Sequence, residues 1–134
     1  MKKFKIRTSS GHFFVCKIFA SKKLMYDYYV NRCKRWKTEQ LSLDFGALVS
    51  PYEKRKNGIL GENIGEAIFY EAKLGAGLIS HEMLHCAMWH ERIVADNKMA
   101  EFGAHCGDIE ERIAYTLTHL VNTFVEKCYK MNIL

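Results

Sequence analysis

Two histidines four residues apart, with a glutamate beside the first, are the residues of this chain best suited to chemistry. His81, Glu82 and His85 form the pattern HExxH. Residues four apart on an α-helix lie on one face, so both imidazoles can hold one metal ion. Zinc prefers nitrogen and sulfur ligands, and a catalytic zinc keeps one position open for water. Glu82 lies beside that face, where it can take a proton from water and pass it to a leaving amine. The pattern predicts a hydrolytic Zn²⁺ site.

The alternative is a pair of ordinary helix histidines, because HExxH also arises by chance in helices. In that case His81 and His85 are half-buried side chains and Glu82 is a surface residue. The surroundings favour the metal site. The motif lies in an apolar stretch, residues 78–88, which follows a strand-like segment and precedes a long helical pattern that opens with two glutamates.

The residues alone leave the third metal ligand open. His90 is excluded, because it lies nine residues after His81, about 180° around the same helix, and points away. His105 and Cys106, in the following loop, are candidates.

Glu110 and Glu111 are the other candidates, because they open the last predicted helix. Glu111 also stands three residues after Asp108, and D-x-x-E is a capping-box signature that needs no metal. On a helical wheel, Glu110 lies closer than Glu111 to the apolar stripe of the helix. That stripe consists of Ile113, Leu117, Leu120, Val121 and Phe124.

A strand, an HExxH helix, a loop and a glutamate at the start of a second helix resemble the arrangement in gluzincins. In that family the ligand glutamate is followed by a small residue and by apolar residues at set positions. Read from Glu111, those positions hold Ala114 and then Ile113, Leu117, Leu120 and Val121. Residues 64–125 also resemble small phage- and prophage-encoded HExxH metallopeptidases. The resemblance implies a zinc metallopeptidase with His81, His85 and Glu111 as ligands, Glu82 as general base and a peptide or protein substrate.

The same resemblance implies a minimal zincin-like α+β domain over residues 1–134, with a small mixed or antiparallel sheet. The family's edge strand, which pairs with substrate, would be residues 64–72, including Tyr70; an ordinary sheet strand is the alternative. Thermolysin-type gluzincins carry an acid four residues after the ligand glutamate, whereas this chain has Tyr115. Metzincins are excluded, because their third histidine would fall at Glu91. Tyr115 and His119 are candidate oxyanion stabilisers, although each is more often a structural helix residue.

Periodicity and turn residues predict the remaining elements. Phe4 and Ile6 share one side of the first strand, and Ser21 caps a helix in which Leu24, Tyr28 and Cys33 face the core. The predicted elements are strands at 2–8 and 12–19 joined by a turn at 9–11, a helix at 22–37, a strand at 41–49 ended by Ser50-Pro51, a charged turn at 54–58, a strand at 64–72, a helix at 78–93, a loop at 96–107 and a helix from Asp108 to about 130.

Composition sets broader limits. A chain of 134 residues fits one domain, and no apolar run reaches the ~18 residues of a membrane span. The N-terminus lacks the continuous apolar segment of a signal peptide. Five cysteines without an export signal favour free thiols and the cytoplasm, which is the host cytoplasm if the protein is phage-encoded.

Residues 1–37 hold eleven Lys or Arg and a single acid, Asp27, in a chain of net charge +5. Such a segment can contact nucleic acid or an acidic protein. The favoured interpretation is solvated strand and helix faces, since the lysines alternate with aromatic residues. The second functional hypothesis is therefore a non-catalytic accessory factor that binds nucleic acid or protein, with a structural metal or none. Glu82 separates the two, because a structural zinc needs no base.

Overall fold

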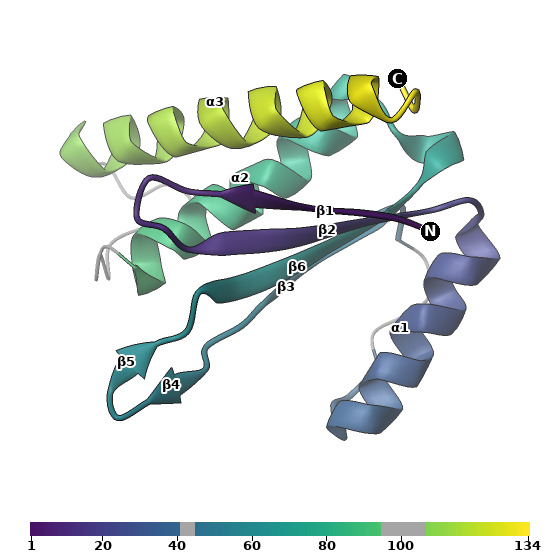
Figure 1. Ribbon diagram of the computed structural model, residues 1–134, viewed down its shortest axis with the longest axis horizontal. Helices are drawn as coiled ribbons and strands as arrows, with labels where there is room; N and C mark the ends of the chain where they lie inside the picture. The colour runs from purple at the N-terminus through teal and green to yellow at the C-terminus, as the bar shows by residue number, and fades with distance from the viewer. Residues whose placement is uncertain (41–44, 95–106) are drawn as a thin grey trace.

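The chain folds into a mixed four-stranded sheet with helices on both faces (Figure 1). The computed structural model describes residues 1–40, 45–94 and 107–134. This confirms the predicted α+β class with a small mixed sheet. The elements are β1 (Lys2–Arg7), β2 (Phe13–Phe19), α1 (Lys22–Trp36), β3 (Ala47–Pro51), β4 (Arg55–Lys56), β5 (Ile59–Leu60), β6 (Asn63–Tyr70), the short 3₁₀ helix η1 (Glu71–Lys73), α2 (Ala76–Ile93) and α3 (Gly107–Lys130).

The strand order is β1-β2-β6-β3, so β1 and β3 form the two edges of the sheet. β2 and β6 run parallel, and the other neighbouring pairs are antiparallel. β6 is therefore an interior strand, and the ordinary-strand alternative is correct for residues 64–72. Burial agrees with this interior position, because every residue from Ile64 to Tyr70 is buried, as expected for a strand covered on both faces.

Close packing inside the sheet explains Gly65. The pairing between β2 and β6 is irregular at Phe13 and Phe14, as in a β-bulge. A Cβ atom at Gly65 would lie 2.8 Å from the ring of Phe14 and 3.2 Å from the carbonyl oxygen of Ser50. Only glycine lets the two neighbouring strands approach this closely.

Each face of the sheet has its own apolar core. On one face, α2 and α3 cover the sheet, and Phe124 packs against Phe4 and Phe69 with ring centroids 5.2 and 4.9 Å apart. On the other face, α1 packs over Ile68 and Tyr70. The four cysteines within the described ranges, Cys16, Cys33, Cys86 and Cys128, are buried and free, as predicted; Cys106 lies outside those ranges.

The predicted cap of α1 is confirmed, since the Leu24 amide donates to the Ser21 hydroxyl over 3.2 Å. The predicted core face is only partly right. Cys33 is buried, but Leu24 is 51% exposed. The helix turns Met25, Tyr29, Arg32 and Cys33 inward instead, because buried Arg32 has an ionic partner on the sheet that the sequence does not reveal.

Most predicted boundaries agree with the structure. The charged turn is the tip of the β4–β5 hairpin, where Asn57 and Gly58 have φ angles of 54° and 78°, as in a type I′ turn. β3 continues through Pro51 rather than ending before it. Residues 41–44 of that predicted strand and 96–106 of the predicted loop lie outside the described residues, and Gly107, the last residue of the predicted loop, begins α3. No helix in the described ranges is long and apolar enough to cross a membrane.

Candidate metal centre

Helix α2 carries the HExxH residues on a flank that faces β3. Its buried side, with Ile79, Met83 and Cys86, packs on the sheet and α3. His81 and His85 project from the adjoining flank and are exposed. The helix follows extended Gly75 and continues for 18 residues, so the motif sits within regular helix, as predicted.

The two imidazoles converge. Nε2 of His81 lies 3.2 Å from Nε2 of His85, and the rings meet edge to face with centroids 4.9 Å apart. Two nitrogen ligands at about 2.0–2.1 Å from a tetrahedral zinc ion are roughly 3.3 Å apart. The separation of the two nitrogens therefore fits a shared zinc ion without rearrangement of the helix.

Glu82 is 7% exposed, although the two histidines of the motif face solvent. Burial raises the pKa of this carboxyl, while the nearby His85 and His81 lower it to a smaller extent. A carboxylate with a raised pKa is a stronger base. If the HExxH pattern arose by chance, Glu82 would be a surface residue, and its burial does not agree with that alternative.

A cavity of about 440 Å³ joins the motif to the edge of the sheet. Of the strands that the structure describes, only β6 pairs with β3, so the other edge of β3 has no strand partner. Trp89 lines the cavity, and its indole N–H donates to the carbonyl of Ile64 over 2.8 Å. The lining residues are Ala47, Leu48, Val49, Pro51, His81, Glu82, His85 and Trp89.

Among the residues that the structure describes, none joins the two histidines as a third ligand. Glu110 and Glu111 are exposed in the first turns of α3, and α2 and α3 run in opposite directions (Figure 1). At a rise of ~1.5 Å per residue, His85 lies about 12 Å along the helix axis from the C-terminal end of α2 at Ile93. Within the described ranges, no three His, Cys, Asp or Glu side chains form a group able to hold a metal ion. His105 and Cys106 lie outside those ranges.

His90 points away from the motif, as its spacing predicted. It is 5% exposed, and its Nε2 lies 3.0 Å from the hydroxyl of Ser10, which also contacts Nδ1 of His12 at 2.9 Å. Burial lowers the pKa of His90, although neighbouring Glu91 raises it. This polar cluster fastens the β1–β2 turn to the C-terminal part of α2 and has no direct part in the HExxH cavity.

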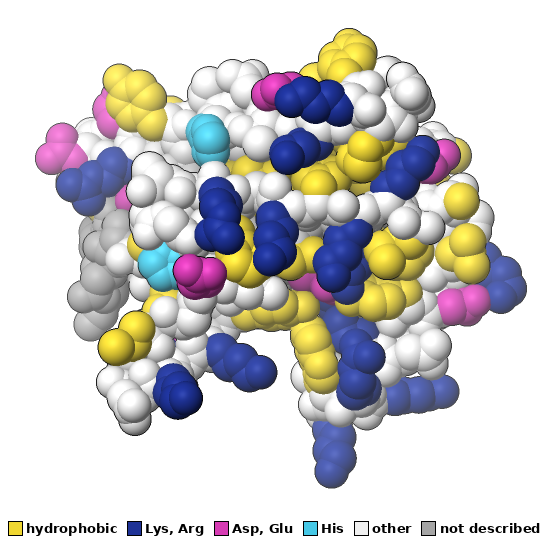
Figure 2. Space-filling model, in the orientation of Figure 1, with side chains coloured by type: hydrophobic (Ala, Val, Ile, Leu, Met, Phe, Trp, Pro, Cys, Tyr) yellow, Lys and Arg dark blue, Asp and Glu magenta, His cyan; other side chains and the backbone are white. Residues whose placement is uncertain are grey.

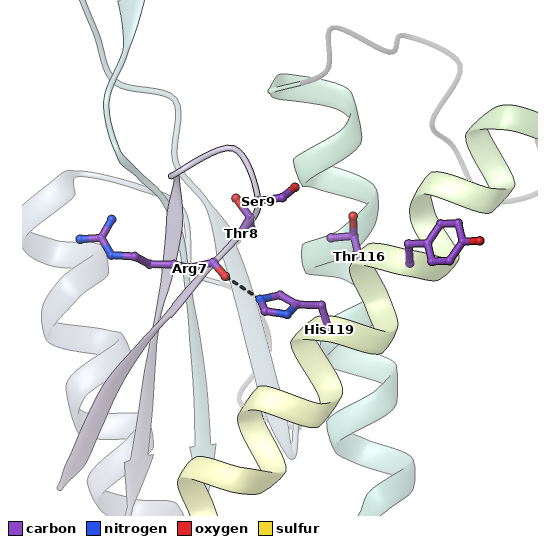
Figure 3. A pocket seen from close by; sticks show the side chains of 6 residues that line it. Arg7, Thr8, Ser9, Thr116 and His119 are labelled. Atoms are coloured by element: carbon purple, nitrogen blue, oxygen red, sulfur yellow. Dashed lines mark hydrogen bonds between the residues drawn. The ribbon is translucent and has the colours of Figure 1, made fainter.

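The two oxyanion candidates lie elsewhere. His119 Nε2 is 2.7 Å from the carbonyl oxygen of Arg7, and Tyr115 is 73% exposed. Both line a different cavity, between α3 and the end of β1 (Figure 3). Neither side chain lines the cavity of His81 and His85. Both are therefore better interpreted as structural helix residues than as oxyanion stabilisers.

Sequence reasoning missed the part played by β3. The sequence predicts a strand at 41–49, but its position beside the HExxH helix depends on the sheet order. A scan against protein-family models and searches of curated proteins and of solved structures returned no significant match.

Proposed function

We propose that this protein is a zinc-dependent metallopeptidase of the gluzincin type. One observation carries the proposal: the Nε2 atoms of His81 and His85 lie 3.2 Å apart, beside the buried carboxyl of Glu82 and on a shared cavity. Two histidines four residues apart on a helix are neighbours in any case, so the buried Glu82 and the cavity that all three side chains line are what favour a site over a chance pair.

His81 and His85 would hold the ion, and Glu111 is the third ligand that the gluzincin resemblance selects. A zinc ion bound there would supply Lewis acidity toward a carbonyl oxygen and toward water. Glu82 accepts the proton that water loses on attacking the peptide carbonyl and returns it to the leaving amine, so no net proton is taken up by the enzyme. Its raised pKa suits both steps.

β3 is the proposed binding strand for an extended peptide. Its outer edge offers backbone N–H and C=O groups for strand addition, and the cavity beside it is lined by Ala47, Leu48 and Val49. A peptide held on this edge passes close to His81 and Glu82. The apolar lining favours apolar side chains near the cleaved bond.

Glu82→Gln tests the mechanism, because it keeps the side-chain shape and removes the base. With a quenched-fluorescence peptide mixture and zinc-loaded protein, hydrolysis should fall by about 10²–10⁴-fold while bound zinc stays at wild-type stoichiometry. Glu62→Gln, an exposed change on the loop before β6, is the matched control and should leave both unaltered. Survival of activity in Glu82→Gln would disprove this role of Glu82.

The third ligand is assigned by titrating zinc into two neighbouring variants. Glu111→Ala should weaken zinc binding strongly, whereas Glu110→Ala should not. If Glu111 only caps the helix together with Asp108, its loss costs about 1 kcal/mol of stability and no zinc. Loss in Glu110→Ala alone moves the ligand by one residue, and normal affinity in both variants points to His105 or Cys106.

A non-catalytic accessory factor is the second candidate, and it is favoured by the lack of a third ligand among the described residues. A structural zinc is closed by four protein ligands and has no water to activate. In that case Glu82→Gln changes neither zinc content nor function. Metal analysis well below one zinc per chain after zinc addition would remove the zincin proposal altogether.

A further inference from the structure

The edge of the sheet opposite β3 carries a straight row of cations. On β1, Phe4 and Ile6 are buried toward α3, so Lys3, Lys5 and Arg7 point to the opposite, exposed face. Figure 2 shows dark blue side chains in a row across the middle of the molecule, over β1 and β2. No helix of the described chain covers this part of the sheet, because α1 packs over β2 and β6 instead.

This row lacks acidic partners. Within the described ranges, none of Lys3, Lys5 and Arg7 forms an ion pair. Lys5 and Arg7 instead lie over the ring of Phe13, at 4.3 and 5.2 Å from its centroid. Other cations in the described part of the chain are paired with carboxylates, among them Lys2, Lys17, Lys23, Arg32, Arg55 and Lys130. Positive charge that is not neutralised internally is available to an anionic partner.

Helix α3 extends the basic surface across the free edge of β1. Two open cavities, of about 370 and 580 Å³, lie between the strand and the helix and share Arg7 and His119. In Figure 3 the imidazole of His119 meets the backbone of Arg7, whose guanidinium points to the other side of the strand. None of the residues that line the two cavities carries a carboxylate. Most of the remaining lining residues carry a hydroxyl or a positive charge: Phe4, Lys5, Thr8, Ser9, Tyr115, Thr116, Thr123 and Lys127.

We propose that this surface binds single-stranded nucleic acid, with the phosphodiester backbone along β1. Alternate residues of a strand are about 6.6–6.8 Å apart, a spacing similar to that of successive phosphates on an extended strand. One straight row follows one backbone, whereas a duplex presents two. Tyr115, exposed beside the same edge, offers a ring on which a base can stack.

The proposed surface is separate from the candidate metal centre. β1 and β3 lie at opposite edges of the sheet, and the two sets of lining residues share no member. Nucleic-acid binding should therefore be the same in wild-type protein and in Glu82→Gln. The nucleic-acid proposal therefore does not depend on the peptidase proposal, and either can fail without the other.

The test is fluorescence anisotropy with a labelled oligothymidylate across a series of salt concentrations. Lys3→Gln/Lys5→Gln/Arg7→Gln removes three cations while keeping aliphatic stems at positions 5 and 7, beside Phe13. The slope of log K against log salt should become shallower by about 2, at ~0.7 per lost phosphate contact on a single strand. Tyr115→Leu should weaken binding without changing that slope, because stacking is uncharged.

The matched control, Lys34→Gln/Arg35→Gln/Lys37→Asn, removes the same charge from the end of α1. Asn suits position 37, whose φ angle is 54°. Binding in this control should stay within a factor of two to three of wild type, and thermal melting confirms that both triple variants fold. Four results overturn the proposal: absence of binding at low salt, equal losses in the two triple variants, equal affinity for a duplex of the same length, or equally effective competition by polyglutamate.

Discussion

Replacing Glu66 should lower the stability of the protein strongly, because its buried carboxylate holds an ionic network together. Its carboxylate pairs with Arg32 and lies 2.8 Å from the ammonium of Lys17, and the Tyr28 hydroxyl donates to it over 2.7 Å. Arg32 in turn donates to the Ser50 hydroxyl over 2.6 Å. The network thus ties α1 to β3, the strand beside the candidate metal centre, and Glu66→Gln would leave two cations around one neutral amide.

The magnitude follows from burial. The side chains of Glu66 and Arg32 are 4% exposed, and that of Lys17 is 14% exposed. Removing one partner of a buried ion pair typically lowers the free energy of unfolding by about 3–5 kcal/mol. For 134 residues, an unfolding entropy of roughly 0.28 kcal/mol/K converts this into a fall in Tm of roughly 10–18 °C.

The pH dependence gives an internal check. Burial by itself raises the pKa of Glu66, but hydrogen bonds from Lys17 and Tyr28 and the charges of Lys17 and Arg32 outweigh it and lower the pKa. A carboxyl with a lowered pKa in the folded state stabilises the protein above its unfolded pKa of about 4.3. That contribution is lost as pH falls through the folded-state value, so wild type and Glu66→Gln should converge in strong acid.

Urea unfolding of both proteins between pH 7 and strong acid measures the difference. Glu53→Gln is the control, because the pair of Glu53 with Arg55 is 54% and 44% exposed and such surface pairs contribute roughly 0–1 kcal/mol. If Glu66→Gln loses no more than the control at pH 7, the buried network does not stabilise the fold. A gap between the two proteins that is independent of pH would show that the charge of Glu66 is not the cause.

Three further predictions concern the site and the sheet. Glu82→Gln should raise the free energy of unfolding of metal-free protein at pH 7, since burial opposes the charged form of Glu82. Calorimetry should show this gain vanishing below about pH 4.3, where the wild-type carboxyl is neutral in both states. Gly65→Ala should lower stability by about 1–3 kcal/mol through its clash with Phe14, and unchanged urea unfolding would contradict the close packing. Zinc at a hundredfold excess over Kd should stabilise wild type by about 2.7 kcal/mol but not His81→Ala or His85→Ala, and a chelator should reverse the shift in melting.

The sequence predicted the order and extent of most elements because local signals define them. The Ser21 cap and the Ser9–Gly11 turn both lie where expected, and Gly11 has a φ angle of 83°. It predicted the convergence of His81 and His85 for the same reason, since residues four apart on a helix share a face.

What the sequence could not predict depends on contacts between distant residues. The interior position of β6 follows from its parallel pairing with β2, and no local pattern specifies a neighbour so far along the chain. The inward turn of Arg32 on α1 depends on Glu66, a residue of β6. The third metal ligand is the same kind of question, because it depends on how α3 lies against α2 and on residues 95–106.

The parallel pairing of β2 with β6 also affects when the candidate metal centre can assemble. Cys16 of β2 is paired with Ala67 of β6, across the whole of α1 and β3. Closing so long a loop is slow compared with forming helices and hairpins. A chain emerging from the ribosome can form the β1–β2 hairpin early, but it has no sheet on which α2 can dock until Tyr70 has been synthesised. The cavity between the HExxH helix and β3 therefore forms only after this long-range pairing, at a late step of folding.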